Sequence, residues 1–124
     1  MKPLIVFISL FISVYCNAQS LKITIYNKTG YDVDSVYIAS TYVGSIKKGD
    51  STIVLNCKKL TLQDGVPFGF FEGGTIKNKV HKPYPQNVGW CGTGVHSETT
   101  GEYKFYIAYG EDKEGYSLWW DWHK

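Results

Sequence analysis

The sequence contains no arginine. All 13 of its basic residues are lysines, and with 11 acidic residues the formal net charge at pH 7 is only +2. Arginine is the side chain that most often binds base edges and phosphates, because its planar guanidinium group donates two parallel hydrogen bonds. Its absence predicts that the protein has no nucleic-acid partner.

Helical periodicity and long apolar runs are also missing. No stretch places apolar residues at the three-to-four-residue spacing of an amphipathic helix. No segment approaches the roughly 20 apolar residues that a membrane-spanning helix needs. We therefore predict an all-β protein with no stable membrane span.

Patterns typical of catalysis or metal binding are absent from the sequence. It has no recognisable Ser-His-Asp set, no catalytic carboxylate pair and no glycine-rich phosphate loop. His81, His96 and His123 lack the mutual spacing of zinc ligands. Asp32 and Asp34 lack the glycine-bearing loop of a calcium site. We predict no catalytic residue, no metal and no cofactor.

The N-terminus has the pattern of a signal peptide. One lysine precedes an almost continuous apolar run over residues 4–14, and the segment ends at Ala18. This run suits a signal peptide but is too short for a stable membrane anchor. We predict cleavage between Ala18 and Gln19, which makes residues 1–18 a signal peptide and residues 19–124 a single all-β domain.

A lipoprotein is the alternative interpretation of the N-terminus. Cys16 would then be the acylated residue, but bacterial lipoproteins carry a small residue before that cysteine, and Tyr15 stands there. We therefore expect an exported protein without a lipid anchor. Its expected location is the periplasm or the outside of the cell, as in a Gram-negative bacterium.

Cleavage would leave two cysteines, Cys57 and Cys91. Exported proteins fold in an oxidising compartment, where two cysteines pair by default. We predict one Cys57–Cys91 disulfide, which would stabilise the fold by about 3 to 4 kcal/mol. A catalytic thiol at Cys91 with His96 as its base is the alternative, disfavoured because an exported thiol with an available partner is expected to be oxidised.

Alternation of apolar and polar residues predicts short strands separated by turns rich in Gly, Asp and Asn. The clearest hairpin joins two such strands across residues 110–115. The expected fold is a single antiparallel β-sandwich, immunoglobulin-like or similar, with about seven to nine short strands, and a small β-barrel is the alternative. The predicted strands cover residues 21–26, 33–39, 42–46, 51–55, 60–63, 68–72, 75–81, 102–109 and 116–122.

Residues 82–100 break this pattern. The segment holds two prolines and several glycines around Tyr84, Trp90 and His96. Irregular segments of this length are often functional or held by a crosslink. We predict that this segment contributes to a binding site.

Aromatic residues are abundant: the chain has ten tyrosines, six phenylalanines and four tryptophans. Such rings supply the core of small β domains, but they also stack on ligands. Trp120 and Trp122 share one face of the last predicted strand, and Trp119 points the other way, so at least one of them should lie near the surface. The predicted ligand-binding residues are Tyr84, Trp90, His96, Trp119 and Trp122.

Three short patterns match glycosylation acceptors. Residues 27–29 read Asn-Lys-Thr, an N-glycosylation sequence that matters only in a eukaryotic secretory pathway. Residues 34–36 and 50–52, Asp-Ser-Val and Asp-Ser-Thr, look like acceptors of one bacterial O-glycosylation system. Patterns of three residues also arise by chance.

Residues 27–38 read Asn-Lys-Thr-Gly-Tyr-Asp-Val-Asp-Ser-Val-Tyr-Ile, and Gly44 and a Lys-Gly-Asp-Ser turn at residues 48–51 follow. This stretch resembles the opening of a group of small exported bacterial β-sandwich domains. The resemblance covers about a quarter of the chain and lies in turn and core positions. It implies the fold and carries over no catalytic residue.

These observations predict a monomeric, non-catalytic binding or interaction domain with a protein or glycan ligand. A second interpretation is a periplasmic inhibitor or immunity protein against a cell-wall hydrolase or toxin, because the chain is small, exported and carries a long irregular segment. An enzyme that uses Cys91 and His96 is the third interpretation.

Overall fold

The structure is a computed structural model that describes residues 20–84 and 94–122. No helix occurs among these residues, and hence none that could cross a membrane. The prediction of an all-β fold is confirmed. The predicted signal peptide with Cys16, the Ala18–Gln19 cleavage site, Trp90 and Cys91 lie outside the described residues.

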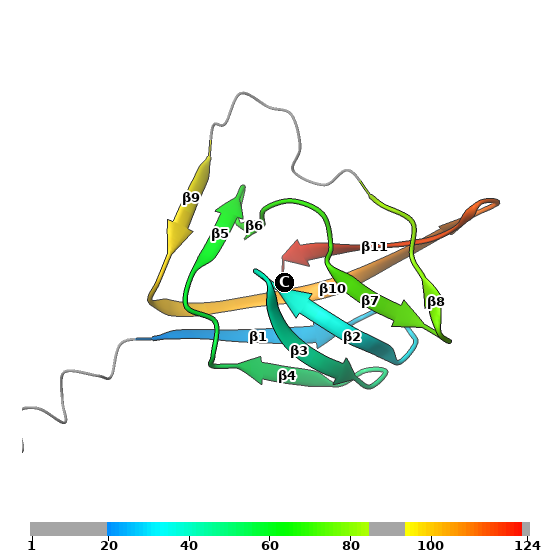
Figure 1. Ribbon diagram of the computed structural model, residues 1–124, viewed down its shortest axis with the longest axis horizontal. Helices are drawn as coiled ribbons and strands as arrows, with labels where there is room; N and C mark the ends of the chain where they lie inside the picture. Colours follow the sequence, from blue (N-terminus) through cyan, green and yellow to red (C-terminus); the bar gives the residue numbers. More distant parts are fainter. Residues whose placement is uncertain (1–19, 85–93, 123–124) are drawn as a thin grey trace, which may run out of the picture.

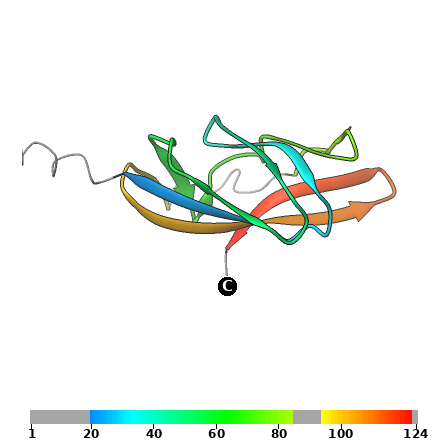
Figure 2. The same ribbon diagram turned by 90° about the horizontal axis from the view of Figure 1, so that it is seen from below.

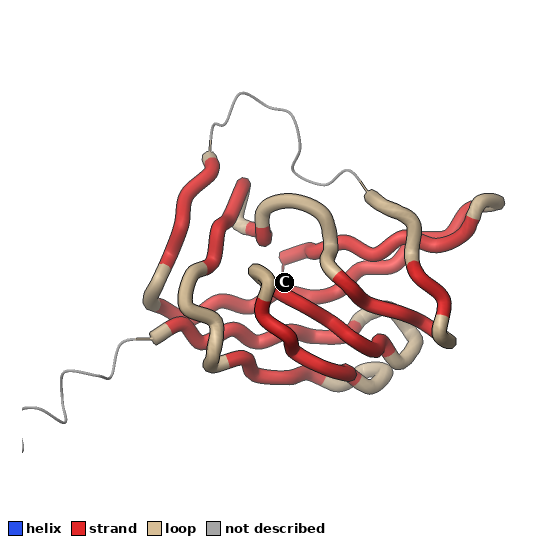
Figure 3. Tube along the Cα trace, in the orientation of Figure 1, coloured by secondary structure: helices blue, strands red, loops and turns tan. Residues whose placement is uncertain are grey.

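Strands joined by turns and short loops make up the described chain (Figure 3). There are eleven strands rather than the seven to nine we predict, because residues 75–81 form two strands and residues 66–67 and 95–98 form strands that we did not predict, whereas residues 68–72 form none. In chain order they are β1 (Leu21–Asn27), β2 (Val33–Ile38), β3 (Thr41–Ile46), β4 (Ser51–Val54), β5 (Leu60–Gln63), β6 (Val66–Pro67), β7 (Gly73–Ile76), β8 (Lys79–Val80), β9 (Val95–Glu98), β10 (Gly101–Asp112) and β11 (Gly115–Trp122).

The strands form three sheets (Figure 1). The first sheet has the order β11-β10-β1-β4, the second β3-β2-β7-β8 and the third β6-β5-β9. Figure 2 shows the second sheet lying over one face of the first. Within the described residues no sheet closes on itself, so the small-barrel alternative is wrong.

One strand pair differs from the predicted antiparallel arrangement. β1 lies between β10 and β4, antiparallel to β4 but parallel to β10, with Leu21 opposite Gly101 and Asn27 opposite Ile107. A parallel pair requires a long crossover, and here the crossover includes every strand from β2 to β9. Apolar alternation marks which face of a strand is buried but not the direction of its neighbour, so the sequence could not show this.

Three predicted segments are wrong. Residues 75–81 are not one strand, because Lys77 and Asn78 turn the chain with φ values of 53° and 61° between β7 and β8, which pair as a hairpin. Residues 68–72 form no strand, because Gly69 has a φ of +94° and the chain turns between β6 and β7. Conversely, the predicted irregular segment at residues 82–100 contains β9, which pairs with β5. The partner of β9 lies more than 30 residues earlier in the chain, and the local sequence does not reveal it.

The core lies between the sheets, and its apolar residues in β1 alternate as predicted, although Thr24, predicted on the wet face, is buried as well. Leu21, Ile23 and Ile25 of β1 are fully buried, and Phe105 of β10 and Trp120 of β11 lie beside them in the same cluster. Each such side chain stabilises the fold by about 1.5 to 3 kcal/mol through the apolar area it removes from water. Trp119, the neighbour of Trp120, points to the opposite face as predicted and is only partly buried.

The turn after β1 uses a buried hydrogen-bond network, which we call the Asn27 turn (residues 27–31). Asn27 is only 1% exposed, and its Nδ2 donates to the carbonyl oxygens of Tyr31 at 2.7 Å and Ile46 at 2.9 Å. Its Oδ1 accepts from the backbone N–H and the hydroxyl of Thr29 at 3.0 and 2.7 Å. The Asn-Lys-Thr pattern therefore fixes a turn, and a folded chain leaves no room for a glycan on Asn27. Ser35 and Ser51 are exposed, and their O-glycosylation stays a prediction.

The predicted disulfide gains no support from the structure. Cys57 is buried and forms no disulfide among the described residues, and its Sγ lies 3.4 Å from the carbonyl oxygen of Lys59. No disulfide occurs within residues 20–84 and 94–122, and Cys91 lies outside these ranges. The Cys57–Cys91 bridge stays a prediction.

Candidate functional site

Two of the five predicted ligand-binding residues lie together. The rings of Tyr84 and Trp119 are stacked, with centroids 4.6 Å apart and planes inclined by 22°. Tyr84 is 41% exposed. Trp119 lies over Gly110, where an added Cβ would stand 2.9 Å from its Cη2 atom. Because Gly110 has no side chain, the indole ring of Trp119 can lie directly against its backbone.

Tyr84 reaches Trp119 because residues 82–84, which we call the strap, are bound to β11. The backbone N–H of Lys82 donates to the carbonyl oxygen of Tyr116 at 2.9 Å, and Lys82 forms a parallel bridge with Ser117. Its ammonium group forms an ion pair with Asp112 on the tip of the β10–β11 hairpin. The hydrogen bond from the Lys82 ammonium group to the Asp112 carboxylate holds the pKa of that carboxyl below its ordinary value.

A cavity of about 460 Å³ lies beside the stacked rings. Its charged groups come from the strap and the hairpin tip. One of them, Glu111, already accepts a hydrogen bond at 2.7 Å from the hydroxyl of Tyr109, which raises the pKa of that tyrosine. The lining residues are Lys82, Pro83, Tyr84, Gly110, Glu111, Asp112, Glu114, Ser117 and Trp119.

The other three predicted site residues do not join this pair in the described chain. His96 lies on β9 in the third sheet, exposed, with Nδ1 3.2 Å from the carbonyl oxygen of Gly94 and Nε2 3.6 Å from Glu98. It is not among the residues that line the cavity beside Tyr84. Trp90 and the side chain of Trp122 lie outside what the structure describes.

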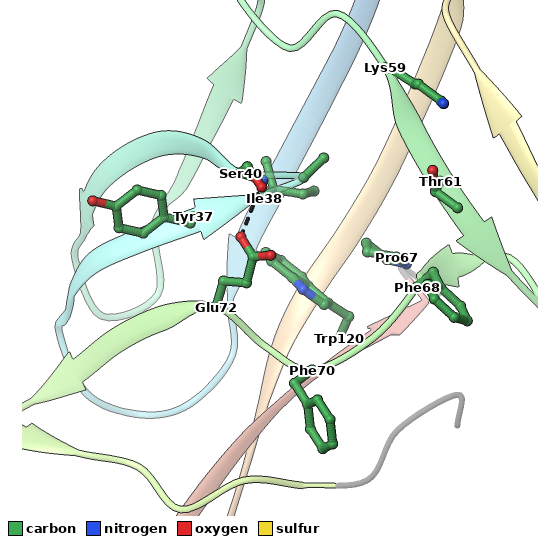
Figure 4. A pocket seen from close by; sticks show the side chains of 11 residues that line it. Tyr37, Ile38, Ser40, Lys59, Thr61, Pro67, Phe68, Phe70, Glu72 and Trp120 are labelled. Atoms are coloured by element: carbon green, nitrogen blue, oxygen red, sulfur yellow. Dashed lines mark hydrogen bonds between the residues drawn. The ribbon is translucent and has the colours of Figure 1, made fainter. Parts of the chain in front are cut away.

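A cleft that we did not predict opens between the second and third sheets (Figure 4). Trp120 lies at its floor, and the exposed rings of Phe68 and Phe70 stand beside it at 50% and 51% exposure. Phe71 packs against the buried face of this floor, its ring centroid 4.6 Å from that of Trp120. The cleft has a volume of about 320 Å³ and is lined by Tyr37, Ile38, Ala39, Ser40, Lys59, Thr61, Pro67, Phe68, Phe70, Glu72 and Trp120.

One wall of this cleft is a strained hairpin. Ala39 and Ser40 connect β2 to β3 with φ values of 47° and 61°, a left-handed conformation that glycine and asparagine adopt more readily. The backbone N–H of Ser40 donates to Oε2 of Glu72 at 3.2 Å (Figure 4). The strained turn and the carboxylate therefore hold each other at the cleft wall, and strain of this kind is often found at binding sites.

A third, mostly apolar cavity of about 450 Å³ shares lining residues with each of these two sites. It shares Tyr37 and Phe70 with the Trp120 cleft and Pro83 with the cavity beside Tyr84. We call these three adjoining cavities the aromatic groove. The middle cavity is lined by Ser35, Tyr37, Phe70, Phe71, Gly73, Gly74, Thr75, Val80, His81 and Pro83.

The chemistry of the aromatic groove suits binding. It presents exposed ring faces together with a few charged groups, Glu72 and Lys59 in the Trp120 cleft and Glu111 and Glu114 beside Tyr84. Among the described residues no three His, Cys, Asp or Glu side chains are grouped so that they could hold a metal ion. A signal for the cleft was present in the sequence: Pro67-Phe68-Gly69-Phe70 combines two turn formers with two large apolar rings.

No protein-family model, curated protein or solved structure matches this chain. The resemblance of residues 27–38 to small exported bacterial β-sandwich domains therefore stays a prediction. Any statement about function has to be argued from the chemistry of the aromatic groove.

Proposed function

We propose that this protein is an exported, non-catalytic binding domain that holds an extended segment of a protein partner in the aromatic groove. The observation that carries the proposal is the pair of half-exposed rings, Phe68 and Phe70, beside the floor formed by Trp120. Large apolar rings exposed together at a concave surface are typical of interaction sites. Buried aromatic anchors at such sites supply most of the binding energy.

The three cavities suit a chain-like ligand rather than a compact one. The apolar middle cavity accepts an aliphatic or aromatic side chain, with Phe70 and Tyr37 as the shared wall toward the Trp120 cleft. Glu72 and Lys59 in that cleft offer an acceptor and a donor to the ligand backbone or to its charged groups. The partner's segment would therefore present an apolar residue flanked by polar ones.

We also infer three features that accompany this function: the type of sandwich, the export signal and the disulfide. The first and second sheets form an immunoglobulin-like sandwich, residues 1–18 direct export, and a Cys57–Cys91 disulfide crosslinks the mature domain. A thiol count on the purified mature protein tests the last point. Two reactive thiols after denaturation would contradict the disulfide and would return the Cys91–His96 enzyme to consideration.

Binding measurements with matched variants test the proposed function. The partner is captured from the native envelope fraction, purified, and titrated with the wild type, Phe70→Ala and Leu55→Ala. Leu55 is 63% exposed and lies in none of the three cavities, so it serves as the control. We expect affinity to fall about 10- to 100-fold for Phe70→Ala and to remain unchanged for Leu55→Ala. Equal affinities for all three proteins would contradict the proposal, and a hydrolase or toxin as the partner would identify the domain as an inhibitor or immunity protein.

A glycan ligand is the second candidate, and a different observation favours it. The Tyr84–Trp119 stack presents a ring face beside the carboxylates of Glu111 and Glu114. Sugars combine an apolar C–H face with hydroxyl groups at the edge, so a ring with nearby acceptors matches both. Gly110→Ala tests this site without removing a side chain, because the new Cβ displaces Trp119. Loss of glycan retention in Gly110→Ala and Tyr84→Ala, but not in Phe70→Ala, would favour the glycan over the protein segment.

A further inference from the structure

Three tyrosine rings line a further small cavity, which we call the tyrosine pocket. Tyr109 on β10 lies close to the other two, with its ring centroid 5.3 Å from that of Tyr31 and 5.8 Å from that of Tyr116. The cavity has a volume of about 160 Å³, the space of about five water molecules at roughly 30 Å³ each. Of its described lining residues only Glu111 also lines the aromatic groove. The lining residues are Tyr31, Ile76, Lys77, Lys79, Tyr109, Glu111 and Tyr116.

Two of these tyrosines already use their hydroxyl protons. The Tyr116 hydroxyl donates to the carbonyl oxygen of Lys79 and accepts from the backbone N–H of Ile76 at 3.0 Å. The Tyr109 hydroxyl donates to Oε2 of Glu111 at 2.7 Å. These hydrogen bonds hold the rings in place, so a group in the pocket meets ring faces and a carboxylate. Because the face of an aromatic ring is negative, such a surface attracts a cation and disfavours an anion.

A cation already lies against one ring of the pocket. The ammonium nitrogen of Lys77 is 5.3 Å from the centre of the Tyr31 ring, within the roughly 6 Å over which a ring face attracts a cation. Tyr31 is itself fixed by the Asn27 turn, because its carbonyl oxygen accepts from Nδ2 of Asn27 at 2.7 Å. Lys77 belongs to the two-residue turn between β7 and β8 and has a φ of 53°, a conformation for which asparagine and glycine are preferred. A lysine therefore stands over the pocket at a position where the turn itself favours other residues.

We propose that the tyrosine pocket is a binding site for small organic cations that carry a methylated ammonium group, such as the choline group, and that Lys77 covers it when no ligand is bound. A quaternary ammonium ion has no N–H donor and loses no hydrogen bond to water when it enters a pocket of rings, whereas the ammonium of lysine has three donors. Such ions are recognised by several rings placed around them. The ligand would contact all three tyrosines. This site needs neither the protein partner nor the glycan of the proposed function.

The charges around the pocket determine how tightly it holds a cation. Glu111 contributes a negative charge, and Lys77 and Lys79 contribute two positive ones. Both lysines are exposed, so their ammonium groups can stay in water while their alkyl stems line the wall. Lys77 competes with the ligand for the Tyr31 ring. Removal of its charge should therefore strengthen binding, an effect that a purely structural contact between Lys77 and Tyr31 would not produce.

An NMR titration of the mature protein with choline chloride at constant ionic strength tests this site. The neutral probe is 3,3-dimethylbutan-1-ol, which has the shape of choline without its charge. We expect saturable shifts of the tyrosine ring signals with a dissociation constant of about 1 to 10 mM for choline, and binding of the alcohol that is at least about 10-fold weaker. Lys77→Gln should bind choline about three- to fivefold more tightly. Lys58→Gln is the control and should match the wild type, since Lys58 is exposed and lines none of the four cavities.

Absence of saturable shifts with choline, equal affinity for choline and the alcohol, or wild-type affinity in Lys77→Gln would each overturn the site. Tyr109→Leu should lose choline binding, and retained affinity in a folded Tyr109→Leu would also overturn it. If that variant does not fold, Lys77→Gln still decides.

Sedimentation with vesicles identifies the source of the cation once choline is shown to bind. Cosedimentation with phosphatidylcholine but not with phosphatidylglycerol vesicles would assign a lipid headgroup as the ligand. Choline binding without cosedimentation would assign a free organic cation. Both results support the site, and neither depends on the partner of the aromatic groove, so the two proposals fail separately.

Discussion

The Asn27 turn and the aromatic groove use their side chains in opposite ways. In the turn, Asn27 and Thr29 are buried, and the amide of Asn27 meets a partner at both its nitrogen and its oxygen. In the groove, Phe68 and Phe70 leave half of their surface in water. The turn is the more conspicuous motif in the sequence, yet the polar side-chain groups of Asn27 and Thr29 are used to fix the backbone. Exposed apolar surface that the fold does not use is the better indication of a binding site.

The largest stability loss is expected in the turn. Asn27→Ala would leave the carbonyl oxygens of Tyr31 and Ile46 and the N–H of Thr29 without this partner. We expect the free energy of unfolding to fall by about 3 to 5 kcal/mol, because each buried unpaired group costs about 1 to 3 kcal/mol. Urea denaturation measures this, with the exposed Asn56→Ala as the control at under about 0.5 kcal/mol. If the two variants unfold at the same urea concentration, the hydrogen bonds of Asn27 do not stabilise the fold and the role given to the turn is wrong.

A backbone substitution at the edge of the groove is expected to have the next largest effect. In Gly73→Ala, the new Cβ would collide with the carbonyl oxygen of Ser35 and lie 2.7 Å from Cδ2 of Tyr37, at a φ of +66°. We expect a loss of about 2 to 4 kcal/mol from the strain and the displaced β2 backbone. Gly49→Ala has a similar φ of +77° but nothing within 4 Å, and should lose only about 1 kcal/mol. Thermal unfolding of the two variants gives the comparison, and equal losses would show that the contact with β2 is not tight.

The strained hairpin should show a smaller effect. Glu72→Ala removes the carboxylate that accepts from the N–H of Ser40, an exposed hydrogen bond. We expect a loss of about 0.5 to 1 kcal/mol, because solvent competes for both groups. Glu72→Gln should keep most of that stability, since an amide oxygen can still accept. Amide hydrogen exchange at Ser40 checks the assignment: faster exchange is expected in Glu72→Ala only, and unchanged exchange would contradict it.

Phe70→Ala should have the smallest effect on stability, about 1 kcal/mol or less, because half of the ring is already in water. Denaturation in urea measures this loss. A loss of about 3 kcal/mol or more, as for a core phenylalanine such as Phe105, would show that Phe70 belongs to the core. The stability loss in Phe70→Ala therefore shows whether the Phe70 ring is free to contact a ligand or is part of the core that stabilises the fold.

Much of the fold could be predicted from local patterns, and much of the site could not. Alternation correctly placed β1, the β10–β11 hairpin and the opposite faces of Trp119 and Trp120. It could not show that β1 runs parallel to β10, because the direction of a neighbouring strand leaves no mark on the pattern.

The site depends on contacts between distant segments. Phe68 and Phe70 read as same-face positions of a predicted strand, but in the structure they flank a turn at Gly69 and are both half-exposed. Tyr84 and Trp119 were both predicted to bind ligand, but their stacking depends on the bridge between Lys82 and Ser117. Such placements come from tertiary structure, which local propensity does not determine.

The most direct test of the central claim is the dissociation constant of the purified partner for the wild type and for Phe70→Ala, measured by calorimetry with both proteins shown to be folded. The binding account predicts an affinity about 10- to 100-fold weaker for Phe70→Ala, with Leu55→Ala equal to the wild type. The same dissociation constant for all three proteins would contradict the claim that the aromatic groove is the binding site.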